Sequence, residues 1–213
     1  METKKIKMIN NGESLNDALN LAEKFADDLK LQGKNKFIVR LLTEEMFSMF
    51  KAITGDFVGE FWIACDNAEN NYSLHLKAQP SSQLDYEKRR DLLSASSKGN
   101  NIASTGLMDK IRGIVEAGIY HFNEGIKIQA EYNSGMLDYA AMGSVMNAGV
   151  SHAIYSWSMQ QYKNSVAADK DKNQTALEAF DELEKSIIAN IADDVQVGVT
   201  KDNAEIIIIK KLN

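Results

Sequence analysis

Residues 36–53 read Lys-Phe-Ile-Val-Arg-Leu-Leu-Thr-Glu-Glu-Met-Phe-Ser-Met-Phe-Lys-Ala-Ile, and this stretch decides the fold. Apolar side chains recur in it at steps of three and four residues, which predicts one buried helix. The apolar stripe consists of Ile38, Leu42, Met46, Met49 and Ile53, and it is widened by Phe37, Leu41 and Phe50. A helix that is apolar on most of its circumference has to be covered on more than one side.

Two carboxylates, Glu44 and Glu45, stand in the middle of this stretch. Adjacent helical positions point about 100° apart, so only one of the two can be fully solvated if the helix is covered on two sides. The other then has to be paired, protonated or functional, because an isolated buried charge is costly. Two interpretations stay open. Either both carboxylates lie at the polar margin of the helix, or one lies at the wall of a pocket.

The composition is that of a globular chain. Its 213 residues suffice for one large domain or two small ones, and 44% are hydrophobic and 25% charged. The net charge of −6 argues against sequence-independent binding of nucleic acid, which requires a positive surface. We therefore expect no nucleic-acid partner.

The single cysteine, Cys65, allows no intramolecular disulfide, which fits a reducing compartment, and we expect it to be a small buried residue. The basic N-terminus lacks the apolar run of a signal peptide. Residues 139–162 form the most apolar long stretch, but Ser, Asn, His and Gln interrupt it. We interpret it as a buried or interface helix and expect a cytoplasmic protein with no membrane partner.

Around the opening stretch, patterns of period two and period 3.6 alternate. Residues 4–10 suggest a strand, and Ser14 is a candidate N-cap of a helix that extends to about residue 31. Residues 60–65 and 72–78 suggest a hairpin across a polar linker. The only proline, Pro80, marks a boundary after the second of these strands.

The second half of the chain contains further helices and a closing strand pair. Gly106 begins an apolar helix, and residues 177–191 form an amphipathic one with Leu177, Phe180, Leu183, Ile187 and Ile191 inward. Residues 195–200 and 204–212 predict a second hairpin, whose Ile206–Ile209 run indicates a strand that is covered on both faces or central in its sheet. We expect an α+β two-layer sandwich: a mixed, mostly antiparallel sheet with helices on one face and an added helical section.

Standard catalytic motifs are missing. His75, His121 and His152 lack the spacing of a zinc site, and no residue cluster predicts a separate metal site. The chain has no Gly-x-Ser-x-Gly elbow, no P-loop and no Gly-x-Gly-x-x-Gly. Trp62 and Trp157 are most simply core anchors.

The order of the elements is more informative. A strand, a helix, a helix with a central carboxylate, two strands, a polar segment, a Gly-Leu helix and a closing hairpin resemble the histidine-kinase-like (GHKL) ATPase fold. The closest branch is that of the bacterial anti-sigma-factor serine kinases. Residues 41–51 resemble its N-box helix, and residues 96–107, from Ser-Ser-Lys-Gly-Asn to Thr-Gly-Leu, resemble its ATP lid. The resemblance covers residues 4–120 and 175–213 of a single domain, with residues 121–174 as a helical insertion.

The resemblance implies a site. Glu44 or Glu45 would be the catalytic base in an active member. The implied nucleotide-binding residues are Ser48, Lys51, Ser97, Lys98, Gly99, Gly106 and Leu107. The implied cofactors are ATP and Mg²⁺, or no cofactor in a member that has lost nucleotide binding.

The chain departs from the family pattern at its most informative positions. The family has asparagine four residues after the glutamate, where this chain has Ser48 or Met49, and methionine is a poor ligand for a hard cation. The family's Asp-x-Gly-x-Gly is replaced by Gln-Pro-Ser-Ser-Gln at residues 79–83. These departures indicate a degenerate member.

Three functions are compatible with these residues. The preferred one is a degenerate relative, with weak or lost nucleotide binding, that acts in bacterial signalling by binding a sigma-factor-like or anti-anti-sigma-like protein. The alternatives are an active ATP-dependent serine/threonine protein kinase and a small-molecule sensor with a pocket beside Trp62 or among Tyr139, Tyr155 and Trp157. A homodimer is compatible with each of them.

Overall fold

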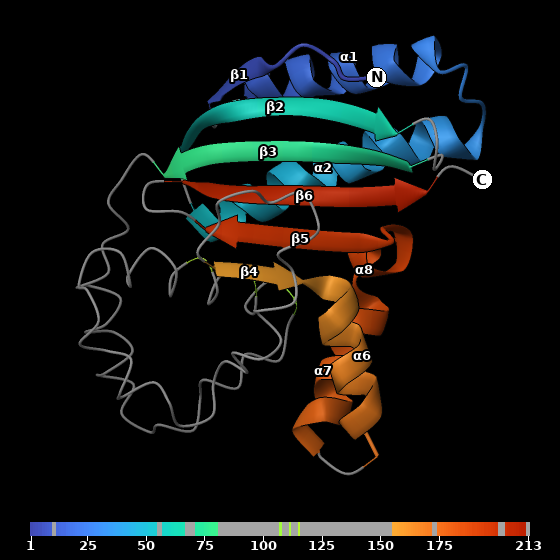
Figure 1. Ribbon diagram of the computed structural model, residues 1–213, viewed down its shortest axis with the longest axis vertical. Coiled ribbons are helices and arrows are strands. Elements are labelled where there is room, and N and C mark those ends of the chain that lie inside the picture. The colour runs from blue at the N-terminus through green and yellow to red at the C-terminus, as the bar shows by residue number, and fades with distance from the viewer. Residues whose placement is uncertain are drawn as a thin grey trace.

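The computed structural model describes residues 1–9, 12–54, 57–66, 71–80, 107, 111, 115, 155–171, 174–199 and 203–211. Within these residues the chain forms an antiparallel sheet with helices on one face (Figure 1). The α+β class expected from the sequence is therefore confirmed. The expected lid, residues 96–106, lies outside the described residues.

Six strands form the sheet in the order β1-β2-β3-β6-β5-β4, and every pair of neighbours is antiparallel. The strands are β1 (Ile6–Ile9), β2 (Phe57–Asp66), β3 (Asn71–Pro80), β4 (Tyr155–Ser158), β5 (Asp194–Val199) and β6 (Ala204–Lys211). Both expected hairpins are present, as β2–β3 and β5–β6. The isoleucine run lies in β6, between β3 and β5. Ile206 and Ile208 face the helices, and Ile207, which projects from the opposite face, is buried as well.

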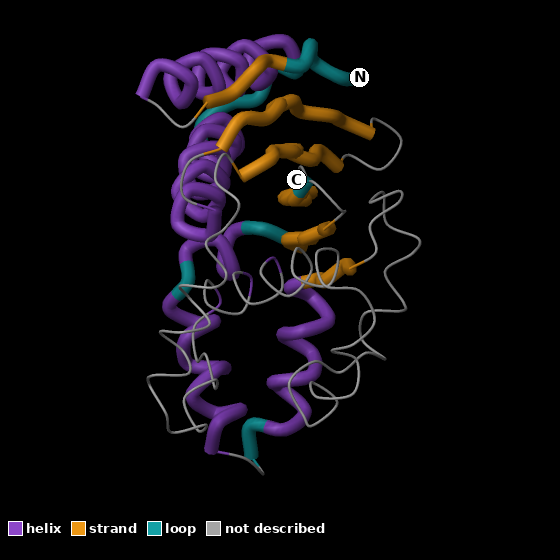
Figure 2. The backbone as a smooth tube through the Cα atoms, turned by 90° about the vertical axis from the view of Figure 1, so that its left-hand side faces the viewer, coloured by secondary structure: helices purple, strands orange, loops and turns teal. Residues whose placement is uncertain are grey.

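The two long N-terminal helices, α1 (Gly12–Asp28) and α2 (Lys34–Thr54), lie on one side of the strands (Figure 2). Gly33, at φ 53°, shapes the short turn between them. Three further described residues, Leu107, Ile111 and Val115, are helical at four-residue spacing and buried in the same core. The helix predicted after Gly106 is confirmed at these positions.

The core lies between the sheet and these helices. A single row of apolar residues crosses all six strands in register and faces the helices: Ile6, Phe61, Leu76, Ile206, Val197 and Trp157. From α2, Leu42, Met46 and Phe50 meet this layer, and each of them is fully buried. The prediction that residues 36–53 form the central helix is confirmed, with two further residues at the N-terminal end and one at the C-terminal end.

The helix α2 is covered on only about half of its circumference. Phe37, expected in the apolar stripe, is 61% exposed, because it lies on the outer side of the helix with Arg40 and Ser48. The expectation that apolar residues wrap most of this helix is wrong at that position. The first helix also begins earlier than expected, at Gly12, so Ser14 is not its N-cap. The Ser14 hydroxyl instead accepts a hydrogen bond from the Ile9 amide at 3.1 Å.

The added section is not wholly helical. Residues 155–158 were expected within a helix, but they form β4, the edge strand beside β5. In this strand Trp157 enters the core, while Ser158 turns the chain into α6 (Met159–Asp169) as its N-cap. The alternation of Tyr155 and Trp157 with two serines suits a strand with one buried face. Residues 139–154 lie outside the described part of the chain.

The predicted helix 177–191 is two helices, α7 (Gln174–Lys185) and α8 (Ile187–Ile191). Ser186 adopts an extended conformation between them, and its hydroxyl accepts a hydrogen bond from the Ala189 amide. The break rotates the residues that follow it, so Ile187 is 51% exposed. In α7, before the break, Leu177 is 39% exposed. Both were expected inward. The helices α6 and α7 pair and extend away from the sheet (Figure 1).

Candidate functional site

The helix α2 separates its two central carboxylates, as its geometry requires. Glu44 projects from the outer side of the helix, on the side of α1, while Glu45 lies about 100° further round, beside Ile38 and Met49. Both are partly exposed. The two carboxylates therefore lie at two different margins of the buried side of the helix.

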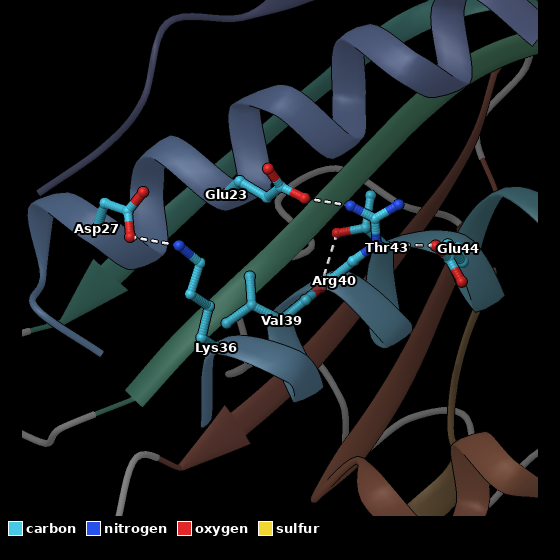
Figure 3. A network of polar contacts seen from close by, with 7 residues as sticks. All are labelled: Glu23, Asp27, Lys36, Val39, Arg40, Thr43 and Glu44. Carbon is cyan, nitrogen blue, oxygen red and sulfur yellow. Dashed lines mark hydrogen bonds and ion pairs between the residues drawn. The ribbon is translucent and has the colours of Figure 1, made fainter. Parts of the chain in front are cut away.

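Glu44 belongs to a charged network between α1 and α2 (Figure 3). The Arg40 Nε donates to Glu44 Oε1 at 3.2 Å, and the Arg40 Nη1 donates to Glu23 Oε1. One turn away, Lys36 pairs with Asp27. The side chains of Arg40, Glu23 and Glu44 are 41–45% exposed, so solvent screens their two ion pairs. Each pair therefore contributes on the order of 0–1 kcal/mol to the stability of the fold.

This network has a chemical consequence for Glu44. A base needs a free lone pair directed at the proton it removes. The Glu44 carboxylate instead faces a guanidinium, which donates to one of its oxygens. As placed, Glu44 links two turns of α2 and, through Arg40, joins α2 to α1.

The positions four residues after each carboxylate do not supply a cation site. Met49, four residues after Glu45, is 2% exposed and belongs to the core. Ser48, four residues after Glu44, is exposed on the outer side of α2. A thioether in the core and a single hydroxyl do not fit the oxygen-rich octahedral shell that Mg²⁺ requires.

Glu45 is the more available of the two carboxylates. It is partly buried, and within the described residues it makes no hydrogen bond or ion pair. Lys51, one helical turn beyond Ser48, is exposed. Glu45 and Lys51 therefore both lie on α2, and no described residue binds both of them.

Of the other predicted site residues, one lies in the described part of the chain. Ser97, Lys98, Gly99 and Gly106 lie outside the described residues. Leu107 is helical and 4% exposed, and it packs in the core with Ile111 and Val115. Its side chain belongs to the core.

A polar cluster that the sequence did not predict lies on the opposite face of the sheet. The rings of Trp62 and His75 stack with centroids 4.7 Å apart and 9° between their planes, and Lys5 Nζ lies 4.2 Å from the Trp62 centroid. His75 Nε2 shares a hydrogen bond of 2.8 Å with Ser73 Oγ, while its Nδ1 lies 3.8 Å from Glu205 Oε1. Trp62 is buried, but not in the core between sheet and helices.

Alternation along the two predicted strands was the available signal for this cluster. Trp62 and His75 both face away from the apolar side of their strands. What sequence could not supply was the register that sets them opposite one another. The approach of Lys5 follows from the register of β1 and β2, in which Ile6 opposes Phe61, so that the residue before Ile6 lies opposite Trp62. Ahead of β1, Glu2 opposes Ala64, so this segment contains one extra residue, a β-bulge.

Burial shifts the pKa of two groups near the β5 end of the sheet. Burial and the nearby Asp193 carboxylate raise the pKa of Tyr72 far above its usual range. Burial lowers the pKa of Lys163, against the opposing effect of Asp194 and Asp193. The Lys163 ammonium donates to the Ala189 carbonyl in α8, so this lysine stabilises a helix end.

Among the described residues, no three His, Cys, Asp or Glu side chains are grouped to hold a metal ion. None of the described helices is long and apolar enough to cross a membrane. No protein-family model, curated protein or solved structure matches this chain.

Proposed function

We propose that the chain has the histidine-kinase-like ATPase fold and is a degenerate member that acts by binding another protein. The order of the described elements supports this assignment. A strand, two helices, a hairpin, helical residues at positions 107, 111 and 115 and a closing hairpin follow one another in the order on which the resemblance rests. The helix α2, which carries Glu44 and Glu45 and is proposed to be the N-box helix, also lies against the sheet (Figure 2).

The single observation that carries the loss of nucleotide chemistry is the state of the central turn of α2. Its outward carboxylate, Glu44, is engaged by Arg40, and the residue in the metal-ligand position after Glu45 is the buried Met49. A working site would present a free base and an oxygen ligand within this turn. The proposed protein therefore keeps the scaffold and has weak or no nucleotide binding.

The proposed partner is another bacterial signalling protein, of the sigma-factor or anti-anti-sigma kind. The support for this class is the resemblance to the anti-sigma branch together with the disabled turn of α2. A fold member that has lost phosphoryl transfer still offers a rigid α+β scaffold for binding. Function would then be exerted by holding and releasing the partner.

Calorimetric titration with Mg²⁺ and a non-hydrolysable ATP analogue tests the nucleotide part of the proposal. We expect no heat of binding at millimolar nucleotide. Micromolar binding that is lost in Glu44→Gln or Glu45→Gln would overturn the proposal. The partner arm is tested by titrating purified sigma-factor and anti-anti-sigma proteins of the source organism, and the absence of any complex among them contradicts it.

A second function, an active serine/threonine protein kinase, draws support from one observation. Glu45 makes no hydrogen bond or ion pair within the described residues, so its carboxylate is free to accept the proton of an attacking hydroxyl. This function requires transfer of labelled phosphate from ATP to a partner hydroxyl, with loss of transfer in Glu45→Gln. Glu44→Gln is the matched control, because Glu44 is held by Arg40 and its removal should leave transfer intact.

A further inference from the structure

Three polar side chains, those of Ser73, His75 and Glu205, lie next to one another on the face of the sheet that is turned away from α1 and α2. Ser73 and His75 are two residues apart in β3, so both project from the face opposite to that of the buried Leu74. Glu205 projects from the same face of β6, where it opposes Lys77. Two strands thereby bring a hydroxyl, an imidazole and a carboxylate together.

The imidazole of His75 lies between the other two groups. Its Nε2 is 2.8 Å from Ser73 Oγ, and its Nδ1 is 3.8 Å from Glu205 Oε1. Nδ1 is buried and, among the residues that the structure describes, has no hydrogen-bond partner. The nearby carboxylate favours the tautomer with a proton on Nδ1, because a carboxylate attracts an N–H and repels a ring lone pair. Nε2 then accepts the hydrogen bond that Ser73 Oγ donates.

Trp62 fixes the orientation of this imidazole. The strand register sets Trp62 opposite His75, and the two rings stack with centroids 4.7 Å apart and 9° between their planes. Rotation of the imidazole out of this plane would cost the stacking contact, so its Nε2 stays directed at Ser73. The side chains of His75 and Glu205 are only 16% and 19% exposed, which limits the water that competes for their hydrogen bonds.

We propose that Ser73 is the nucleophile of an acyl-transfer site, with His75 as its general base and Glu205 as the positioning carboxylate. A serine–histidine–carboxylate set is recognised by its geometry and not by the order of its residues along the chain. The distance of 3.8 Å between Nδ1 and the carboxylate is longer than a hydrogen bond. Such contacts are often long in an unliganded site and shorten when substrate binds.

The proposed reaction has two steps. Ser73 Oγ attacks the carbonyl carbon of an ester while His75 Nε2 takes the Oγ proton. The bond from the carbonyl carbon to the leaving oxygen breaks, the alcohol leaves with that proton, and the acyl group stays on Ser73. Water then attacks the acyl carbon and gives a proton to Nε2, which returns it to Ser73 Oγ as the carboxylic acid departs.

The surroundings of Ser73 define the class of ester. Across the sheet it is opposed by Ala64 in β2 and by Ile209 in β6, and these three residues are each only partly buried. A small acyl group therefore meets apolar surface beside the hydroxyl. Because β3 is paired on both sides, its amides around Ser73 are bonded within the sheet and do not stabilise an oxyanion. The substrate class is thus a small ester with a good leaving group, such as an aryl acetate.

A fluorophosphonate probe tests the nucleophile in the full chain, because it labels activated serines and leaves ordinary hydroxyls unmodified. Peptide mapping by mass spectrometry should find the probe on Ser73, and p-nitrophenyl acetate should be cleaved faster than in buffer alone. Ser73→Ala should abolish the labelling, and His75→Gln should slow labelling and ester cleavage at least about a hundredfold. Ser165→Ala, at an exposed serine of α6, is the matched control and should change neither.

Variants of Glu205 separate positioning from packing. Glu205→Gln keeps the size of the side chain but no longer favours the proton on Nδ1. It should therefore lower kcat at least about tenfold and leave KM unchanged. Glu205→Asp restores a carboxylate and should recover part of the lost kcat. Equal losses in the two variants, or a change in KM alone, would overturn the positioning role of Glu205.

Three results would overturn the proposal as a whole: a probe that labels no residue, a probe that labels a residue other than Ser73, or labelling of Ser73 that persists at the natural rate in His75→Gln. Circular-dichroism melting separates lost activity from lost folding. If one of the variants does not fold, the mapped label on the natural chain and the other variant decide the matter. The test requires neither nucleotide nor a signalling partner, so it is independent of the proposed function.

Discussion

At the scale of single residues, Tyr72 is the most unusual group in the core. Its side chain is 1% exposed and packs against Phe25 with ring centroids 6.1 Å apart. Among the residues that the structure describes, its hydroxyl has no hydrogen-bond partner, although a buried donor without a partner is costly. The ring therefore stabilises the fold, while the hydroxyl opposes it.

Removal of this hydroxyl tests that assignment. Tyr72→Phe keeps the ring and should leave the free energy of unfolding unchanged or raise it by about 1 kcal/mol. Tyr72→Ala, which also removes the ring, should cost at least about 3 kcal/mol. Urea denaturation measures both. A loss of stability in Tyr72→Phe comparable to that of the alanine variant would show that the hydroxyl is bonded in solution.

The raised pKa of Tyr72 also predicts a pH dependence. An acid whose pKa is raised on folding keeps its proton in the native state while the unfolded chain ionises from the ordinary value of 10.0. The unfolded state then binds fewer protons, so stability falls as pH rises above about 10 and is unaffected well below it. At pH 11 the natural chain should have lost about 1.4 kcal/mol relative to Tyr72→Phe. Equal losses in the two proteins between pH 9 and 11 would contradict this.

At the scale of elements, Asp194 joins β4 and α6 to β5. Its Oδ1 accepts from Ser158 Oγ at 2.9 Å and from the Gln160 and Val195 amides, both at 2.9 Å. Its Oδ2 accepts from Gln196 Nε2 at 3.1 Å. A carboxylate at the first turn of a helix is also favoured by the helix dipole. One side chain thus positions the α6–α7 pair relative to the sheet.

Substitution of Asp194 should be costly in proportion to the bonds that it loses. Asp194→Ala leaves several donors without their acceptor and should lower the free energy of unfolding by at least about 3 kcal/mol. Asp194→Asn keeps an oxygen for the Oδ1 bonds and should cost less. Asp181→Ala, at an exposed site on α7, is the control and should change stability by less than about 0.5 kcal/mol. Thermal denaturation of the three variants ranks them, and an Asn variant as unstable as the Ala variant contradicts this assignment of bonds.

At the scale of the whole molecule, the sheet determines which parts open first. The strands β3 and β6 are bonded on both sides, whereas β1 and β4 are four-residue edge strands. At this edge Lys7 lies in β1, and Lys5 and a bulge lie in the segment just before it, features that discourage pairing with a further strand. Stability should therefore decrease from the centre of the sheet to its edges.

Native-state hydrogen exchange can measure this gradient. Amides of β3 and β6 should exchange only through global unfolding, because their opening requires both neighbouring strands to separate. Amides of β4 should exchange faster, by local opening together with α6. Protection in β4 equal to that in β6 would mean that the β4–α6 unit is as stable as the sheet centre.

Much of this architecture follows from local pattern. The stripe of residues 36–53, the alternation in both hairpins and the Ile206–Ile209 run predicted α2, β2–β3 and β5–β6, because burial of one face imposes a period on the sequence. The break at Ser186 and the strand at residues 155–158 were missed. A capping serine and a four-residue strand are short signals, and tertiary contacts decide them.

The same division holds for the carboxylates of α2. Local sequence is enough to place Glu44 and Glu45 on one helix, and it shows Ser48 or Met49 four residues further on, where a Mg²⁺ site would need an oxygen ligand. The packing of distant segments sets Arg40 against Glu44 beside α1, and it sets Trp62 opposite His75. The physical reason is that helical periodicity is encoded within a segment, whereas ion pairs between helices and register between strands depend on how distant segments pack.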